Sequence, residues 1–222
     1  MLKRIVWQVA LATVVMVSPA LAQQKRVEVS FLAGWTFADG VDGQSVVTPS
    51  GIFDRVDPKD SFKWGFDVGV LAGDNAEVGF LFGQQKTQLQ VSGTTTVDVG
   101  DSTISTYHGY FGYNWGESDA KVRPYALIGL GATNYGGVDF TRANGQTGTI
   151  GSETQFSTTW GAGVKFFPSP SVGARIGIHW TPTYIKSDAE GYWCDPYWGC
   201  YLVGDAQYSN QWDIGGGITF RF

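Results

Sequence analysis

The sequence is poor in the residues that metal and catalytic sites use most. Its 222 residues include two histidines and two cysteines, and only 16% of the chain is charged. No histidine lies near Cys194 and Cys200, and two ligands are too few for zinc. The glycines of residues 129–131 lie within a strand pattern, so they do not form a phosphate-binding loop. We therefore expect no metal and no cofactor.

Positive charge and long apolar runs are also scarce. The formal net charge is −5 at neutral pH, which argues against nucleic acid as a partner. After residue 22, no apolar run is long enough for a transmembrane helix. A membrane location would therefore require a closed β-barrel, because only helices and closed barrels satisfy every backbone polar group in lipid.

Residues 1–22 have the organisation of a secretory signal peptide. Lys3 and Arg4 form a basic start, residues 5–17 are almost uninterruptedly apolar, and residues 20–22 read Ala-Leu-Ala. The alternative is an N-terminal membrane anchor, but the apolar run is short for a spanning helix. We expect export, cleavage after this motif, and one mature domain over residues 23–222.

Glycine and aromatic residues are abundant, with 31 glycines and 15% aromatic residues. Both are weak helix formers, whereas alternation of apolar and polar residues indicates strands. The alternating segments are 25–37, 61–72, 76–90, 103–115, 123–135, 154–167, 172–185 and 208–222. In the fifth segment we expect Ala126, Ile128, Leu130 and Ala132 to face outward, although Tyr125 and Leu127 compete for that face.

The connections between these segments alternate in length. Short turns lie at 72–75, 116–122 and 168–171, and longer connections at 38–60, 91–102, 136–153 and 186–207. Aromatic residues near strand ends are Trp35, Phe62, Trp64, Trp115, Phe156, Trp180, Trp212 and Phe222. An even strand number, short periplasmic turns, long external loops and aromatic girdles are typical of transmembrane barrels. The sequence predicts an all-β, eight-stranded antiparallel up-and-down transmembrane β-barrel.

Two stretches carry a resemblance to a known group. Residues 208–222 alternate strictly and end on Phe220 and Phe222, which resembles the assembly signal of bacterial outer-membrane barrels. Residues 160–168, followed by 172–178, are similar to a recurrent hairpin of small eight-stranded barrels of the opacity-protein and OmpA-like type. The resemblance implies an outer-membrane location, contact with outer-membrane lipids and use of the barrel-assembly machinery. A secreted lipocalin-like barrel, or an ordinary last strand of a soluble sheet, is the alternative.

An eight-stranded barrel has an interior just wide enough for side chains to fill. Charges removed from water must be paired, so the inward residues predict a salt-bridged plug. A narrow polar pathway for small solutes is the alternative. The expected interior charge network is Glu28, Lys63, Asp67, Glu77, Lys165, Arg175, Asp213 and Arg221.

The inward face also carries the two histidines, which are the candidates for a catalytic site. Some small outer-membrane barrels modify lipid A, and a deacylase of similar size uses His, Ser and Glu at its lipid face. His108 and His179 both point inward by alternation, and His179 shares its face with Thr181 instead of a serine. The triad is not matched, so we expect a non-enzymatic barrel without catalytic residues.

The last long connection combines cysteines with aromatic residues. In an oxidising envelope, Cys194 and Cys200 predict a disulfide. Around them lie Tyr192, Trp193, Tyr197, Trp198 and Tyr201. These rings either cap the barrel mouth or form a recognition loop for an unknown extracellular ligand. We expect a structural or surface-interaction role, with a narrow porin as the alternative and a lipid-modifying enzyme as the least favoured reading.

Overall fold

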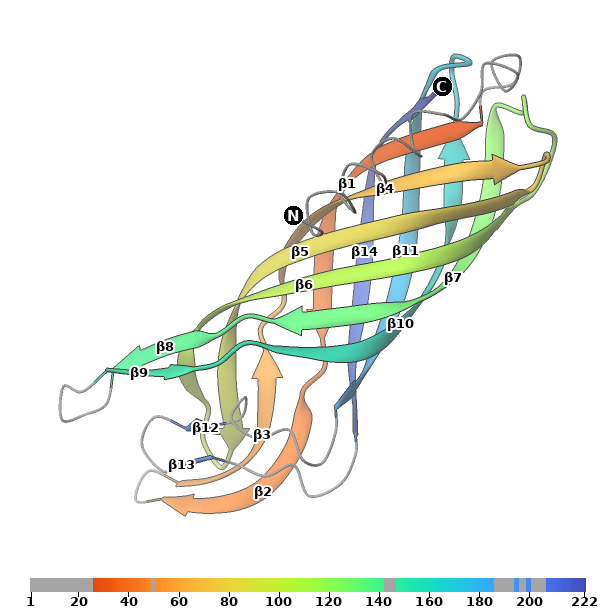
Figure 1. Cartoon of the computed structure of the whole chain (residues 1–222). Coiled ribbons are helices and arrows are strands. Elements are labelled where there is room, and N and C mark those ends of the chain that lie inside the picture. The colour runs from red at the N-terminus through yellow and green to blue at the C-terminus, as the bar shows by residue number, and fades with distance from the viewer. Residues whose placement is uncertain (1–25, 49–50, 142–146, 186–193, 196–198, 201–206) are drawn as a thin grey trace, which may run out of the picture.

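The computed structural model describes residues 26–48, 51–141, 147–185, 194–195, 199–200 and 207–222. Eight long strands form a closed antiparallel barrel, which confirms the predicted fold class (Figure 1). They are β1 (Val27–Ala38), β4 (Ser61–Ala72), β5 (Ala76–Gly93), β6 (Val97–Asn114), β7 (Val122–Tyr135), β10 (Glu153–Phe166), β11 (Val172–Ile185) and β14 (Gln207–Arg221). The described residues contain no helix long and apolar enough to cross a membrane.

The first and last strands close the barrel. β1 pairs with β14 from Glu28 opposite Arg221 to Ala38 opposite Gln211. Beyond the ladder, Val27 and Phe222 exchange backbone hydrogen bonds of 3.2 and 2.8 Å. Every strand of the ring therefore has two hydrogen-bonded neighbours, and no edge of the ring is left unpaired.

Side chains alternate between an apolar outer face and a polar interior, as the period of two in the sequence requires. Phe31 and Ile176 are 60% and 64% exposed on the outer face. The ambiguous fifth segment is settled by β7, where Tyr125 and Leu127 are buried inside and Leu130 is exposed outside. The apolar outer face and polar interior argue against the lipocalin-like alternative, which would place its apolar face inward.

Two bands of aromatic residues surround the outer face. In one, Trp160 lies opposite Trp180, and Trp180 lies opposite Trp212 with stacked rings 5.7 Å apart. In the other, near the short turns, the rings of Tyr113 and Trp115 are 5.3 Å apart. These bands agree with the girdles expected at the two membrane interfaces.

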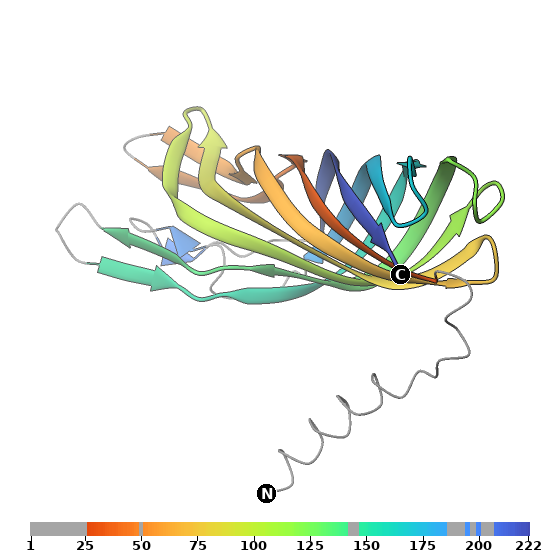
Figure 2. The ribbon, with the colours of Figure 1, turned by 90° about the horizontal axis from the view of Figure 1, so that it is seen from above.

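The two ends of the barrel differ in their connections. The short turns and the C-terminal residue lie at one end, which we call the short-turn end (Figures 1 and 2). Gly73 and Gly116 have φ values of 74° and 94° there, a left-handed conformation that favours glycine. The hairpins that extend past the barrel lie at the opposite, long-loop end.

The structure corrects the expectation of loops at 38–60 and 136–153. These stretches contain β2 (Val41–Thr48), β3 (Gly51–Pro58), β8 (Val138–Thr141) and β9 (Thr147–Ile150). β3 pairs with the far end of β5, β2 pairs with β3, and β8 pairs with β9. The reason is that β5 continues past the end of β4, so its free backbone groups provide a template for β3. We call β2, β3, β8, β9 and the far ends of β5 and β6 the external extension.

Several expectations lie outside the described residues. They concern the signal peptide over residues 1–22 and the aromatic residues Tyr192, Trp193, Tyr197, Trp198 and Tyr201. Of the cysteine segment, the backbone of β12 (Cys194–Asp195) and β13 (Gly199–Cys200) is described, with Cys194 opposite Cys200. The disulfide between them stays a prediction.

Candidate functional site

The interior of the barrel holds layers of ion pairs, and the lowest layer lies at the short-turn end. The Lys165 ammonium donates to Glu28 and to Glu77, with N–O distances of 2.6 Å in both cases. Arg221 donates to the second oxygen of Glu28 over 2.7 and 3.0 Å. All four side chains are at most 6% exposed. Two cations and two carboxylates therefore form one buried, charge-balanced chain of contacts.

Neutral donors complete the coordination of Glu77. The Tyr110 hydroxyl donates to one carboxylate oxygen over 2.7 Å, and the Asn114 amide donates to the other over 2.8 Å. Arg123 is also buried and donates to the backbone carbonyl of Asp74 in the adjacent turn. These contacts tie the lowest layer to the short turns.

The middle layer is a second buried pair. Arg175 donates to Asp67, and both side chains are at most 4% exposed. The Arg175 guanidinium lies 4.5 Å from the ring centroid of Tyr125, within the range of a cation–π contact. The Tyr110 hydroxyl, whose proton points to Glu77, also lies 3.3 Å from a carboxylate oxygen of Asp67, so it joins the lower and middle layers.

The upper layer is more open. Lys63 donates to Asp213 over 2.6 Å, and Thr36 donates to the other oxygen of Asp213 over 2.5 Å. A cavity of about 60 Å³ lies beside this pair, lined also by His108 and His179. A water molecule needs about 10–15 Å³ of such volume, so the cavity has room for a few waters.

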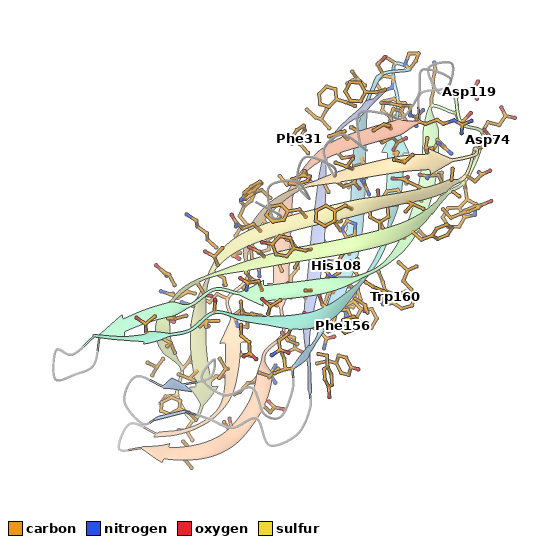
Figure 3. All side chains as sticks on the ribbon, viewed as in Figure 1. Phe31, Asp74, His108, Asp119, Phe156 and Trp160 are labelled. Carbon is orange, nitrogen blue, oxygen red and sulfur yellow. The ribbon has the colours of Figure 1, made fainter. Side chains whose placement is uncertain are left out.

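A hydroxyl network fills the lumen toward the long-loop end, and sequence reasoning missed it. The ring of His108 and the Ser157 hydroxyl are 2.9 Å apart. Thr133 donates to Ser157 over 3.0 Å and accepts from Thr183 over 3.0 Å. A Ser–His contact is one element of a nucleophilic site. Here both side chains are at most 1% exposed and lie inside the barrel, whereas Phe156 and Trp160 lie on its outer face (Figure 3).

The ion pairs of Lys165 and of Arg175 join strands that are not neighbours in the ring, whereas Arg221 and Glu28 lie opposite each other on the neighbouring strands β14 and β1. β10, which carries Lys165, is separated from β1 by β11 and β14, and from β5 by β6 and β7. β4, which carries Asp67, is separated from β11 by β1 and β14. The side chains of these pairs therefore cross the lumen instead of lying along its wall. All eight residues of the expected charge network point into the lumen, and each has an oppositely charged partner there.

The external extension carries a different kind of charge cluster. Arg55 contacts Asp39, Asp42 and Asp57, so one cation serves three carboxylates. Nearby, the hydrogen bond from Lys59 lowers the pKa of Asp98 below its usual value. No group of three or more metal-ligating side chains occurs among the residues that the structure describes.

Comparisons with known proteins agree with this geometry. A family model described as the outer membrane protein beta-barrel domain matches residues 8–222. The outer membrane protein OprG from Pseudomonas aeruginosa is similar in structure, with 11% identity, a TM-score of 0.60, and coverage of 90% of this chain and 97% of that chain. Neisserial surface protein A shows 13% identity, a TM-score of 0.52, and coverage of 88% and 97%. No curated protein matches the sequence.

At 11% and 13% identity, the structural similarities show only a shared fold. The family assignment therefore rests on the match to the family model. It covers every strand of the closed barrel, from β1 to β14. The apolar outer face, the two aromatic bands and the filled polar interior are what such a domain requires in lipid. The chain therefore belongs to the outer membrane protein beta-barrel domain family of the bacterial outer membrane.

Proposed function

We propose that this protein is a non-conducting outer-membrane barrel that acts through contacts at the cell surface. The observation that carries the proposal is the set of buried ion pairs across the lumen, Lys165 with Glu28 and Glu77, and Arg175 with Asp67. A solute that entered from outside would have to separate these charges in a water-poor interior. Breaking a buried ion pair costs several kcal/mol, so the pairs act as a plug.

The external extension supports a role at the surface. Transmembrane barrels place their short turns in the periplasm, so the long-loop end faces outward. Buried apolar residues of this end are Val41, Phe53, Leu89, Val91 and Val138. Such burial holds the extension in one shape, which reduces the ordering cost when a partner binds. Its surface charges, including those around Arg55, offer polar contacts for a macromolecule.

An enzymatic role has weaker support. The contact between His108 and Ser157 lies inside the closed barrel, where a lipid substrate on the outer face does not meet it. Ser157 also accepts a hydrogen bond from Thr133, so the pair is explained as part of the hydroxyl network. We therefore propose a non-enzymatic barrel.

A narrow porin is the second candidate, favoured by the cavity beside Lys63 and Asp213. Planar-bilayer recording separates the two candidates. We expect purified wild-type protein to give no steady ion conductance at neutral pH, because the lower and middle layers block the lumen below the cavity. Insertion is checked independently by heat-modifiable gel migration of protein recovered from the same lipid. Stable ion-selective openings in the wild type would show that the lumen conducts and would favour the porin.

A further inference from the structure

One buried cation of the barrel interior forms no ion pair with any of the described residues. Arg123, near the start of β7, is 0% exposed and has the inward strand parity of Tyr125. Its Nη2 donates to the backbone carbonyl of Asp74. Its Nε and Nη1 meet no acceptor in the described part of the chain. The guanidinium is therefore enclosed at the short-turn end with part of its hydrogen-bonding capacity unused.

Arg123 is also the surplus charge of the lumen. The other lumen charges form ion pairs with one another, and they are four cations and four carboxylates: Lys63, Lys165, Arg175 and Arg221 with Glu28, Asp67, Glu77 and Asp213. Arg123 adds a fifth cation, so the described lumen carries one positive charge too many. Arg221 lies near enough to repel it. A buried charge is costly unless it is paired and hydrogen-bonded, so this one calls for an anion.

A pocket of about 260 Å³ opens at the short-turn mouth beside this charge. Asp74, whose carbonyl accepts from Arg123, lines the pocket, and Arg221 lines it as well. The Arg221 guanidinium lies 3.7 Å from the ring centroid of Phe167, which forms another part of the wall. The pocket therefore reaches the lowest charged layer from the short-turn side.

The charges at the rim of the pocket do not neutralise Arg123. Two cations of the lining, Arg26 and Lys121, are matched in number by two carboxylates. These are Asp74 and Asp119, which are exposed at the short-turn end (Figure 3). The excess of positive charge therefore lies behind the rim, at the buried guanidinium.

We propose that the short-turn mouth binds a small oxyanion, a phosphate or a carboxylate group, between Arg221 and Arg123. Guanidinium groups hold such oxyanions through charge-assisted hydrogen bonds. Arg221 lines the pocket and would contact the anion directly, whereas Arg123 would turn its guanidinium past the Asp74 carbonyl to reach it. The anion would supply the missing acceptor and balance the surplus charge.

The site lies at the end opposite the external extension, so it does not depend on the proposed function. Transmembrane barrels place their short turns in the periplasm, so the oxyanion would enter from that side.

The test titrates the purified, folded protein in octyl glucoside micelles with sodium phosphate and with sodium acetate, at constant ionic strength, by isothermal titration calorimetry. We expect one saturable oxyanion per barrel in the wild type. Arg123→Met is expected to weaken binding by about tenfold or more, because it removes a charge-assisted donor. Arg123→Lys, which keeps the positive charge, is expected to retain part of the binding. Saturation by phosphate alone assigns the site to phosphate groups, and saturation by acetate alone assigns it to carboxylates.

The matched control is Lys86→Met, which removes an exposed cation from the long-loop end and should bind the oxyanion as the wild type does. Heat-modifiable migration shows that each variant is folded. The wild-type titration decides the proposal even if Arg123→Met does not fold: without saturable binding of either probe, ordered water is sufficient for Arg123 and the proposal is overturned. Equal binding by the wild type and folded Arg123→Met would also overturn it.

Discussion

Replacing Lys165 with methionine is expected to lower the free energy of unfolding by about 3–5 kcal/mol, the usual cost of removing one partner of a buried ion pair. Glu77 would keep hydrogen bonds from Tyr110 and Asn114 but would lose Lys165, its one ion-pair partner among the described residues. Glu28 would keep Arg221. Urea unfolding of the barrel in lipid vesicles, followed by tryptophan fluorescence, measures the change.

Two further variants make this prediction specific. Lys121→Met removes an exposed lysine from the short-turn end and should leave the urea midpoint unchanged. The double variant Lys165→Met with Glu77→Gln should lose less stability than Lys165→Met alone, because it removes the uncompensated charge as well. If Lys165→Met unfolds at the wild-type urea concentration, the buried pairs do not contribute the stability assigned to them.

Alternation predicted the strands and their inward residues, and the connection lengths and aromatic residues near strand ends then predicted the barrel. β4 and β11 have the boundaries that the pattern gave, because each is bounded by turn residues and alternates throughout. The inward direction of Glu28, Lys165 and Arg175 follows from the same period of two. A strand with a polar and an apolar face has only one orientation that avoids exposing charge to lipid.

The ion-pair partners of these residues could not be predicted from the sequence. Lys165 meets Glu28 and Glu77 because of the stagger between strands and the width of the ring, and neither is encoded in the local pattern of one strand. The contact between His108 and Ser157 joins β6 to β10 in the same way. β3 was missed because its Gly, Asp and Pro residues are typical of loops. Its pairing partner, the far end of β5, exists only once the barrel has formed.

Glycines also take part in the plug, and their role is visible only in three dimensions. A large side chain that points into the lumen needs a small residue opposite it on the neighbouring strand. A Cβ atom at Gly79 would lie 2.6 Å from both Cζ and the hydroxyl oxygen of Tyr110, and 2.5 Å from the carbonyl oxygen of Val68. The Tyr110 hydroxyl in turn donates to Glu77 and contacts Asp67. The absence of a side chain at Gly79 therefore leaves room for the residue that connects the lower and middle layers.

Gly79→Ala is accordingly expected to destabilise the barrel by about 1–3 kcal/mol, the usual cost of overpacking a filled interior. The matched control is Gly109→Ala on β6, where the Cβ atom would point to the outer face and the nearest atom beyond the adjoining residues, the Leu130 carbonyl oxygen, is 4.0 Å away. That variant should be neutral or more stable by about 0.4–1 kcal/mol, since alanine restricts the unfolded chain. Urea unfolding in the same vesicles compares the two. Equal stability of both variants would mean that Tyr110 can move away from Gly79 without loss, and that the contacts it makes with Glu77 and Asp67 do not fix the plug.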